Sequence, residues 1–107
     1  SVDDSPKAVK QMQDWYPETY MTTIMPAKRT PGVVGPTNVM TYPFFLTVGA
    51  HVPAEIVYKI VKTMAANKKS LAKSHGAFNG FNPKKMKYKN TNVPYHPGAL
   101  KAYKEMM

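Results

Sequence analysis

The chain has 107 residues and a mass of 12.0 kDa, which suits one compact domain or a piece of a larger one. Hydrophobic residues make up 43% and charged residues 20%, so the composition is not that of a disordered protein. No apolar run of about 18 residues occurs, which excludes an ordinary transmembrane helix. The lack of cysteine excludes disulfides, thiolate metal sites and a cysteine nucleophile.

The net charge of +9 favours an anionic partner: nucleic acid, anionic lipid or a small carboxylate. Most of the lysines lie between Lys59 and Lys104, and the only acidic residue after Glu55 is Glu105. The first half of the chain is close to neutral. These lysines give the second half of the chain a positive electrostatic potential, which does not by itself define a binding site.

The first elements expected along the chain are a helix and a short strand. Ser5 caps the free amides of the helix, and Pro6 suits its first turn. Apolar side chains then recur at helical spacing over residues 8–16, and Pro17 ends the element. Residues 19–25 are rich in β-branched and aromatic side chains, which predicts a short strand.

A loop and a long strand follow. Residues 26–36 contain three prolines and two glycines and predict a loop. Residues 37–48 are apolar almost throughout, which predicts a strand covered on both faces. Because Pro43 cannot donate a ladder hydrogen bond, it marks an edge, a bulge or a crossing between sheets.

The second half predicts helices. Val52-Pro53 begins the clearest one, with Glu55 in the first turn where the helix dipole favours an anion. Residues 68–75 predict a second helical segment, residues 77–92 are less regular, and His96-Pro97 begins a last helix. The expected buried stripe of the first of these helices consists of Ile56, Val57, Ile60, Val61 and Met64, and that of the last helix of Leu100, Tyr103 and Met107.

These elements indicate the α/β fold class, but the sequence predicts too few strands for a complete sheet. Two strands cannot cover the apolar faces of the surrounding helices. We therefore expect the sheet partners to lie elsewhere, in another part of a longer chain or in a second copy.

Most catalytic and metal-binding patterns are absent from the sequence, although its composition alone leaves a Ser/His/Asp triad open. His51, His75 and His96 have no partner at metal-ligand spacing, and the serines lack a nucleophile-elbow context. We expect no enzyme activity, no catalytic residue, no metal site and no cofactor.

A nucleic-acid interface is the alternative function. Phe78, Phe81 and Tyr88 could stack on bases. The lysines that could neutralise phosphates there are Lys84, Lys85, Lys87 and Lys89. A solvated basic surface explains the same pattern, and specific binders usually use arginine, of which this chain has only Arg29.

The loop at residues 26–36 is the candidate ligand site. Lys28 and Arg29 lie in it between prolines and glycines, and a guanidinium can bind a carboxylate through two parallel hydrogen bonds. The plainer explanation is a surface loop with two solvated cations, although loops often carry function.

Several motifs resemble the TAXI-family solute receptors of TRAP transporters. Residues 52–60, VPAEIVYKI, resemble the family segment VPEDLVYEI. Residues 93–99, VPYHPGA, followed by Tyr103-Lys104-Glu105, resemble the family ending VPLHPGA…YYKE. Upstream, Tyr16-Pro17 and residues 26–32 resemble the family's YP and PAGTYPG elements, and Pro36-Thr37 resembles the start of its PTVGV strand.

This resemblance implies the carboxyl-terminal part of a periplasmic receptor with the periplasmic-binding-protein type II fold, residues 1–107 forming one unit of it. It implies a crossing strand at residues 37–48, a small organic anion such as glutamate or 2-oxoglutarate as ligand, and a membrane permease as partner. It also implies that a signal peptide was removed or lies in a preceding part of the chain. Apolar surface meant for the other lobe could drive self-association.

The chain departs from the family where ligand contacts are expected. The family's GTY is replaced by Lys28, Arg29 and Thr30, and Val33 stands where a glutamine commonly follows PG. We take Arg29, Lys28 and Thr30 as the ligand-binding residues. For the HPGA motif we prefer a structural role, in which His96 organises the helix start and Gly98 permits close packing.

Overall fold

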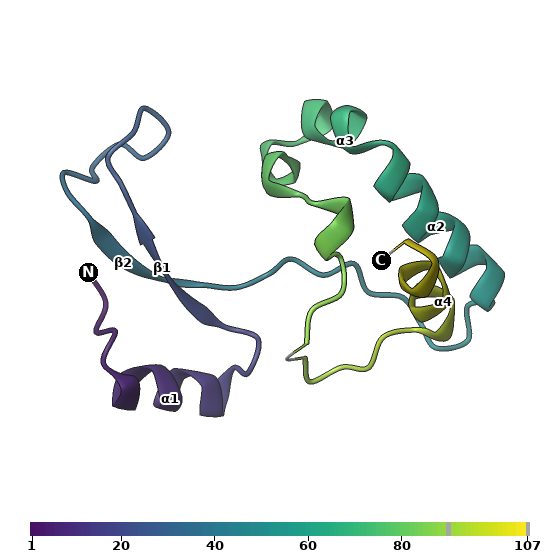
Figure 1. Cartoon of the computed structure of the whole chain (residues 1–107), viewed down its shortest axis with the longest axis horizontal. Coiled ribbons are helices and arrows are strands. Elements are labelled where there is room, and N and C mark those ends of the chain that lie inside the picture. Colours follow the sequence, from purple (N-terminus) through teal and green to yellow (C-terminus); the bar gives the residue numbers. More distant parts are fainter. Residues whose placement is uncertain (90, 107) are drawn as a thin grey trace. The chain divides into compact units, whose positions relative to one another are not determined.

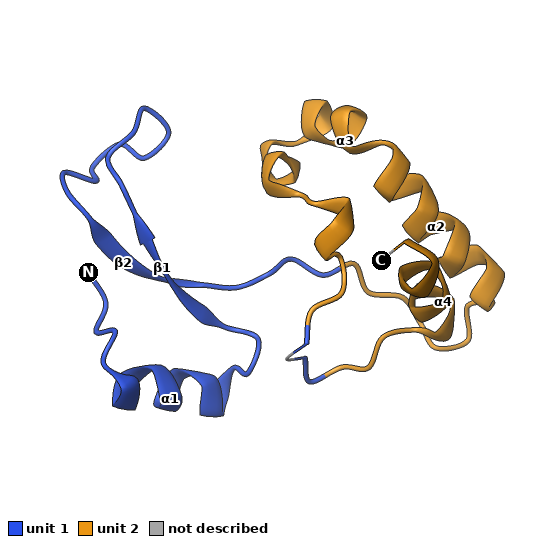
Figure 2. Cartoon of the chain, viewed as in Figure 1, with its two compact units in different colours: residues 1–45, 89–92 blue, residues 46–88, 93–107 orange. Residues whose placement is uncertain are grey.

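The computed structural model describes residues 1–89 and 91–106, and the chain forms two compact units (Figure 1; Figure 2). Unit 1 comprises Ser1–Phe45 and Lys89–Asn92, and unit 2 comprises Leu46–Tyr88 and Val93–Met107. The part of the chain that is described contains four α-helices and a two-stranded sheet, which confirms the predicted α/β class. This content is consistent with a portion of a periplasmic-binding-protein-like fold.

Unit 1 begins with α1, Pro6–Trp15, as the capping pattern predicted. The Ser5 hydroxyl accepts a hydrogen bond from the Ala8 amide at 3.3 Å, which satisfies one of the free donors of the first turn. The helix half-buries the amino-terminal part of its apolar face, but Trp15 at its end is 80% exposed.

The sheet of unit 1 consists of β1, Tyr20–Ile24, and β2, Thr37–Thr41, which pair antiparallel. Tyr20 faces Thr41 at one end of the register and Ile24 faces Thr37 at the other. A side-chain hydrogen bond of 2.8 Å from the Thr23 hydroxyl to Asn38 Oδ1 adds to the ladder. The predicted short strand and the loop after it are therefore confirmed.

The predicted long strand over residues 37–48 is wrong in its length and its coverage. The β2 strand ends at Thr41, two residues before Pro43, which has no amide hydrogen to continue a ladder. The apolar side chains beyond it are exposed, Phe44 at 81% and Leu46 at 67%. We call residues 42–48 the apolar connector, since they join the two units and β2 does not continue through them.

Unit 1 has no buried hydrophobic side chain among its described residues, and Thr19 is its one buried residue. Thr19 ties α1 to β1 by hydrogen bonds: its amide and its hydroxyl donate to the Tyr16 carbonyl at 3.0 and 2.6 Å. The Gln13 side chain donates to the Thr19 carbonyl at 3.1 Å. Polar contacts of this kind hold the helix against the strand in place of a core.

Unit 2 is helical. Its elements, in order, are α2 (Ala54–Ala66), α3 (Lys68–Ser74), the 3-10 helices η1 (Gly76–Gly80) and η2 (Pro83–Lys85), and α4 (Pro97–Met106). The predicted helices at residues 53–66, 68–75 and 97 onward are confirmed. Of the expected stripe on α2, Val57 and Val61 are buried, whereas Ile56 is 49% exposed. The expectation for Met107 lies outside the described residues.

The core of the chain lies between α2 and α4, which cross each other (Figure 1). Tyr103 packs edge to face on Tyr95 with the ring centroids 5.5 Å apart. The buried hydrophobic residues are Val57, Val61, Ala99, Ala102 and Tyr103. Small residues on α4 let the two backbones approach, and larger ones on α2 fill the space that remains.

The backbones of α2 and α4 come close together at Gly98, the second residue of α4. A Cβ added there would overlap the Ala54 carbonyl oxygen and would lie 3.0 Å from the Tyr58 nitrogen, both backbone atoms that cannot move aside. This confirms the prediction that Gly98 serves close packing.

We therefore predict that Gly98→Ala destabilises the chain by about 1–3 kcal/mol, because the overlap forces the helices apart. Equilibrium denaturant unfolding, followed by circular dichroism, measures the change. Gly80→Ala is the matched control, since nothing lies within 4 Å of a Cβ at that position. Equal effects of the two substitutions would contradict the packing role of Gly98.

Candidate functional site

The loop between β1 and β2 presents Lys28 and Arg29 on a tight turn. The Thr30 amide donates to the Ala27 carbonyl at 3.0 Å, so Lys28 and Arg29 occupy the two central positions of a β-turn. Both side chains are exposed, and neither forms an ion pair within residues 1–89 and 91–106. The turn is therefore an uncompensated pair of positive charges.

A second turn follows at once and fixes the first. The Val33 amide donates to the Thr30 carbonyl at 3.1 Å, with Pro31 and Gly32 at the centre of the turn. The φ of Gly32 is 91°, the left-handed value that the third position of a type II turn requires and that side chains disfavour. The geometry of this turn therefore explains why proline and glycine stand at positions 31 and 32.

Thr30 has a different position in the loop from Lys28 and Arg29. Its hydroxyl accepts a hydrogen bond from the Ala27 amide at 3.0 Å and lies 3.2 Å from the carbonyl oxygens of Met25 and Ala27, to which it can donate. These bonds close the loop on itself. Of the three predicted ligand-binding residues, the structure brings Lys28 and Arg29 side by side in solvent and commits the Thr30 hydroxyl to the loop's own backbone.

A polar cluster joins α2 to α4 in unit 2, and we call it the helix clamp. It consists of Tyr58, Lys62, Lys101 and Glu105. The Tyr58 hydroxyl donates to Glu105 Oε2 at 2.5 Å, and Lys62 Nζ lies 3.0 Å from the same oxygen. Lys101 Nζ lies 5.0 Å from the centre of the Tyr58 ring, within cation–π distance.

The charges of the helix clamp support one another. The hydrogen bonds from Tyr58 and Lys62 lower the pKa of Glu105, and the bond to Glu105 raises the pKa of both Tyr58 and Lys62. The cluster thus favours an ionised carboxylate, a protonated phenol and a protonated lysine, which is the arrangement of a structural tie and leaves no free acid or base for chemistry.

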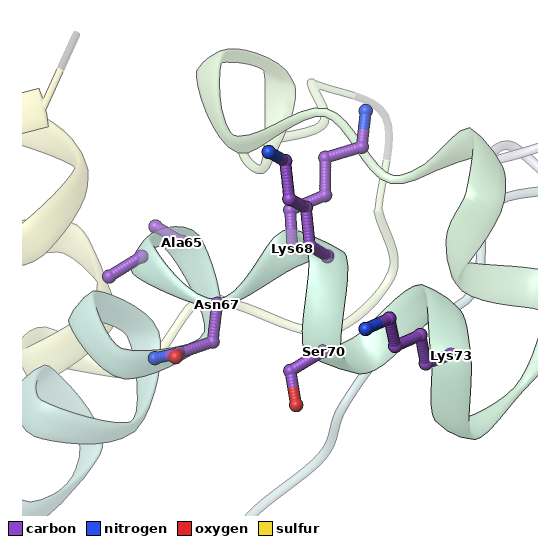
Figure 3. Close-up of a pocket in the computed structure, with 7 residues that line it drawn as sticks. Ala65, Asn67, Lys68, Ser70 and Lys73 are labelled. Atoms are coloured by element: carbon purple, nitrogen blue, oxygen red, sulfur yellow. The ribbon is translucent and has the colours of Figure 1, made fainter.

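A shallow hollow lies where α2 turns into α3, with a volume of about 580 Å³ (Figure 3). Figure 3 shows the Asn67 and Ser70 side chains on one side of the ribbon and Lys68 on the other, so the polar groups do not converge on one point. The residues that line it are Ala65, Ala66, Asn67, Lys68, Lys69, Ser70 and Lys73. The hollow is positively charged but is not a built pocket for one small molecule.

The histidines have local structural roles where the structure shows their contacts. His96 Nδ1 accepts a hydrogen bond from the Gly98 amide at 3.1 Å, which confirms that His96 organises the start of α4. His75 Nδ1 accepts from the Ala77 amide in the same way at 3.1 Å. Over the described ranges, no three potential metal ligands come together, and no helix is both long and apolar enough to cross a bilayer.

The aromatic residues of the nucleic-acid alternative are not displayed as stacking platforms. Phe78 and Phe81 are half-buried and pack edge to face on each other, with ring centroids 6.4 Å apart. The Tyr88 amide donates to the Tyr95 hydroxyl at 2.6 Å, which holds this segment to the start of α4.

A comparison with known protein families shows which family the chain belongs to, because one family model matches residues 2–106, nearly the whole chain. The chain belongs to the NMT1-like family. This is a family of the periplasmic-binding-protein type, so membership gives the chain a substrate-binding role in general terms, with a small-molecule ligand and a transporter as partner. Family members are typically non-enzymatic and usually extracytoplasmic. No curated protein and no solved structure matches the chain.

The helix clamp was not predicted from the sequence, although two of its four residues, Tyr58 and Glu105, lie in motifs that carry the family resemblance. Tyr58 belongs to the VPAEIVYKI segment and Glu105 to the YKE ending, 47 residues apart in the chain. Both motifs are thereby explained by the packing of α2 on α4. The sequence contains one indirect signal of this contact: both motifs resemble segments of the same family.

We predict that Glu105→Gln lowers the melting temperature at neutral pH and has little effect in acid. Since the pKa of Glu105 is lowered in the folded state, its stabilising effect is present above the unfolded value near 4.5 and is lost as the pH falls below it. Thermal unfolding of the wild type and of Glu105→Gln between about pH 3 and pH 8 shows whether their melting temperatures become equal in acid.

The control is Asp14→Asn, which breaks the exposed Lys10–Asp14 pair at 3.1 Å within α1. An exposed pair one helical turn apart contributes little to stability. If Glu105→Gln were no more destabilising at neutral pH than Asp14→Asn, the helix clamp would not join the two helices in solution.

Proposed function

We propose that the chain is the carboxyl-terminal part of an extracytoplasmic TAXI-type solute receptor of a TRAP transporter. It binds a small organic anion, a dicarboxylate or an amino acid such as glutamate, and delivers it to the membrane permease. The family match over residues 2–106 supports the binding role. The TAXI-like motifs of the sequence support the finer assignment.

The observation that carries the ligand class is the cationic turn. Lys28 and Arg29 are adjacent, exposed and without an ion pair in the described part of the chain, and two successive turns fix the backbone below them. A guanidinium presents a planar fork that matches a carboxylate, and a neighbouring ammonium adds charge without strict geometry. We assign Arg29 the bidentate contact, Lys28 the second charge and Thr30 the positioning of the turn.

The exposed apolar surface supports a two-lobed receptor. Two separate compact units of these sizes would together expose roughly 7,200 Å², whereas the chain exposes 8373 Å². Most of the exposed large apolar side chains of the described residues lie on unit 1 and the apolar connector, among them Trp15, Phe44 and Leu46. A second lobe that packs on these residues would bury them and supply the other wall of the ligand site.

The mechanism on this proposal is non-catalytic. A ligand that touches both walls binds the closed form more tightly than the open form, so it shifts the population toward closure. The permease then distinguishes loaded from empty receptor by shape. On this proposal Lys28 and Arg29 contribute to the shift, because the carboxylate is fully enclosed only when the second lobe closes on it.

We predict that Arg29→Gln lowers the affinity for the best carboxylate by tenfold or more, the usual cost of a lost charge-assisted hydrogen bond. A thermal-shift screen of glutamate, 2-oxoglutarate and related acids on the natural protein that carries this sequence identifies the ligand. Titration calorimetry of the wild type and the variant then gives the two dissociation constants.

Lys7→Gln is the matched control, because it removes one exposed positive charge from unit 1 outside the turn. It should leave the affinity within about twofold of the wild type. A flat thermal response to every carboxylate, or equal losses in both variants, would refute the assignment of the turn to an anionic ligand.

A further inference from the structure

The positive charge of the chain is concentrated on one unit. Unit 2 carries ten lysines and two acidic residues, whereas unit 1 carries five basic and four acidic residues. The ligand-binding turn proposed above lies in unit 1 and does not use this charge. The excess on unit 2 therefore needs its own explanation.

The two acidic residues of unit 2 leave a long stretch without negative charge. Glu55 lies in the first turn of α2, and Glu105 is taken up by the helix clamp with Tyr58 and Lys62. Residues 56–104 contain no acidic residue at all. Apart from Lys62, no lysine of this stretch has an ion pair within the described residues.

The exposed lysines on α3 and around η2 lie on connected elements of unit 2. The α3 helix packs against η1, η2 follows η1 after two residues, and α2 contacts both α3 and η2. We define the lysine patch as the exposed residues Lys68, Lys69, Lys73, Lys84, Lys85 and Lys87. The shallow hollow of Figure 3 is the α3 part of this patch.

Local hydrogen bonds hold the η2 part of the lysine patch in place. Asn82 Oδ1 accepts from the Lys84 amide at 3.0 Å, and the Asn82 carbonyl accepts from the Lys85 amide at 2.9 Å. Pro83 further restricts this turn. The two ammonium groups therefore extend from an ordered backbone.

We propose that the lysine patch binds the anionic headgroups of a phospholipid bilayer and holds the receptor at the membrane surface. Lysine is a strongly hydrated point charge on a flexible stem, which suits many mobile phosphates better than one fixed ligand. Each lysine near an anionic surface adds a small and nearly additive attraction that salt screens. The contact is weak and reversible, as a carrier that meets a permease repeatedly requires.

A membrane fits these residues better than nucleic acid does. The patch contains no arginine, and the nearby Phe78 and Phe81 are half-buried against each other and are not free to stack on bases. The choice of a membrane also rests on the extracytoplasmic role proposed above. The ligand-binding turn and the lysine patch use different residues, so vesicle binding and carboxylate binding can fail separately.

Co-sedimentation of the chain with vesicles tests the proposal. The probes are vesicles of phosphatidylcholine alone and vesicles in which about a third of the lipid is phosphatidylglycerol. We expect binding only to the anionic vesicles, with a loss of about a hundredfold or more when the salt rises from about 0.05 M to about 0.5 M. Each of the double variants K84Q/K85Q and K68Q/K69Q should weaken binding by about tenfold.

The control is K7Q/K10Q, which removes the same number of lysines from α1 in unit 1. It should change vesicle binding by less than about twofold. Exposed lysine-to-glutamine changes should leave the circular dichroism spectrum unchanged, so that loss of binding reports the patch and not the fold. Equal losses from K7Q/K10Q and from the patch variants would show that net charge alone matters and would overturn the proposal.

Two further arms distinguish other anions. Inorganic phosphate should release the chain from vesicles no better than chloride at equal ionic strength; stronger release would assign the patch to free phosphate. A DNA oligonucleotide that binds more tightly than the anionic vesicles, with loss in the same patch variants, would make nucleic acid the partner. Either result, or no binding to anionic vesicles at low salt, overturns the membrane assignment.

Discussion

The close contact of α4 with α2 at Gly98 is the constraint on which the folded chain depends. The five buried hydrophobic side chains of the described residues all belong to these two helices. The helices can bury them only if their backbones approach to the distance that Gly98 permits. His96 fixes the start of α4, and the helix clamp joins the two helices at Glu105. The two sequence motifs that contain Tyr58 and Glu105 therefore serve the packing of α2 on α4, and the proposed ligand-binding residues lie elsewhere.

Unit 1 stands in contrast, because its helix and hairpin have no hydrophobic core of their own among the described residues. A two-stranded hairpin is at best marginally stable in water. The aromatic residues of the apolar connector that belong to unit 1, Tyr42, Phe44 and Phe45, are also exposed. Binding proteins of this type put ligand between two lobes, and an element that becomes ordered by contact with a second lobe and a ligand suits that task. The weakness of unit 1 and its proposed role are thus connected.

Sequence reasoning succeeded where the structure is local. Ser5-Pro6, Val52-Pro53 and His96-Pro97 each carry their own signal for a helix start, and all three helices form. It failed for residues 42–48, where apolar composition predicts a covered strand but β2 ends at Thr41 and the side chains of Phe44 and Leu46 are exposed. It also could not separate Thr30, whose hydroxyl closes the loop, from Lys28 and Arg29, and it gave no distance between Tyr58 and Glu105. The Tyr58–Glu105 contact depends on how distant parts of the chain meet, whereas the Thr30 bonds depend on the exact backbone geometry of the loop.

Native-state hydrogen exchange of the chain by itself tests most directly whether one unit is self-supporting and the other is not. Amides of α2 and α4 should exchange slowly, with protection approaching that of global unfolding. Amides of β1, β2 and the apolar connector should exchange at rates close to those of an unfolded chain. Uniform slow exchange from residue 20 to residue 48 would show that unit 1 is stable without a partner. That result would contradict a receptor part whose apolar surface awaits a second lobe.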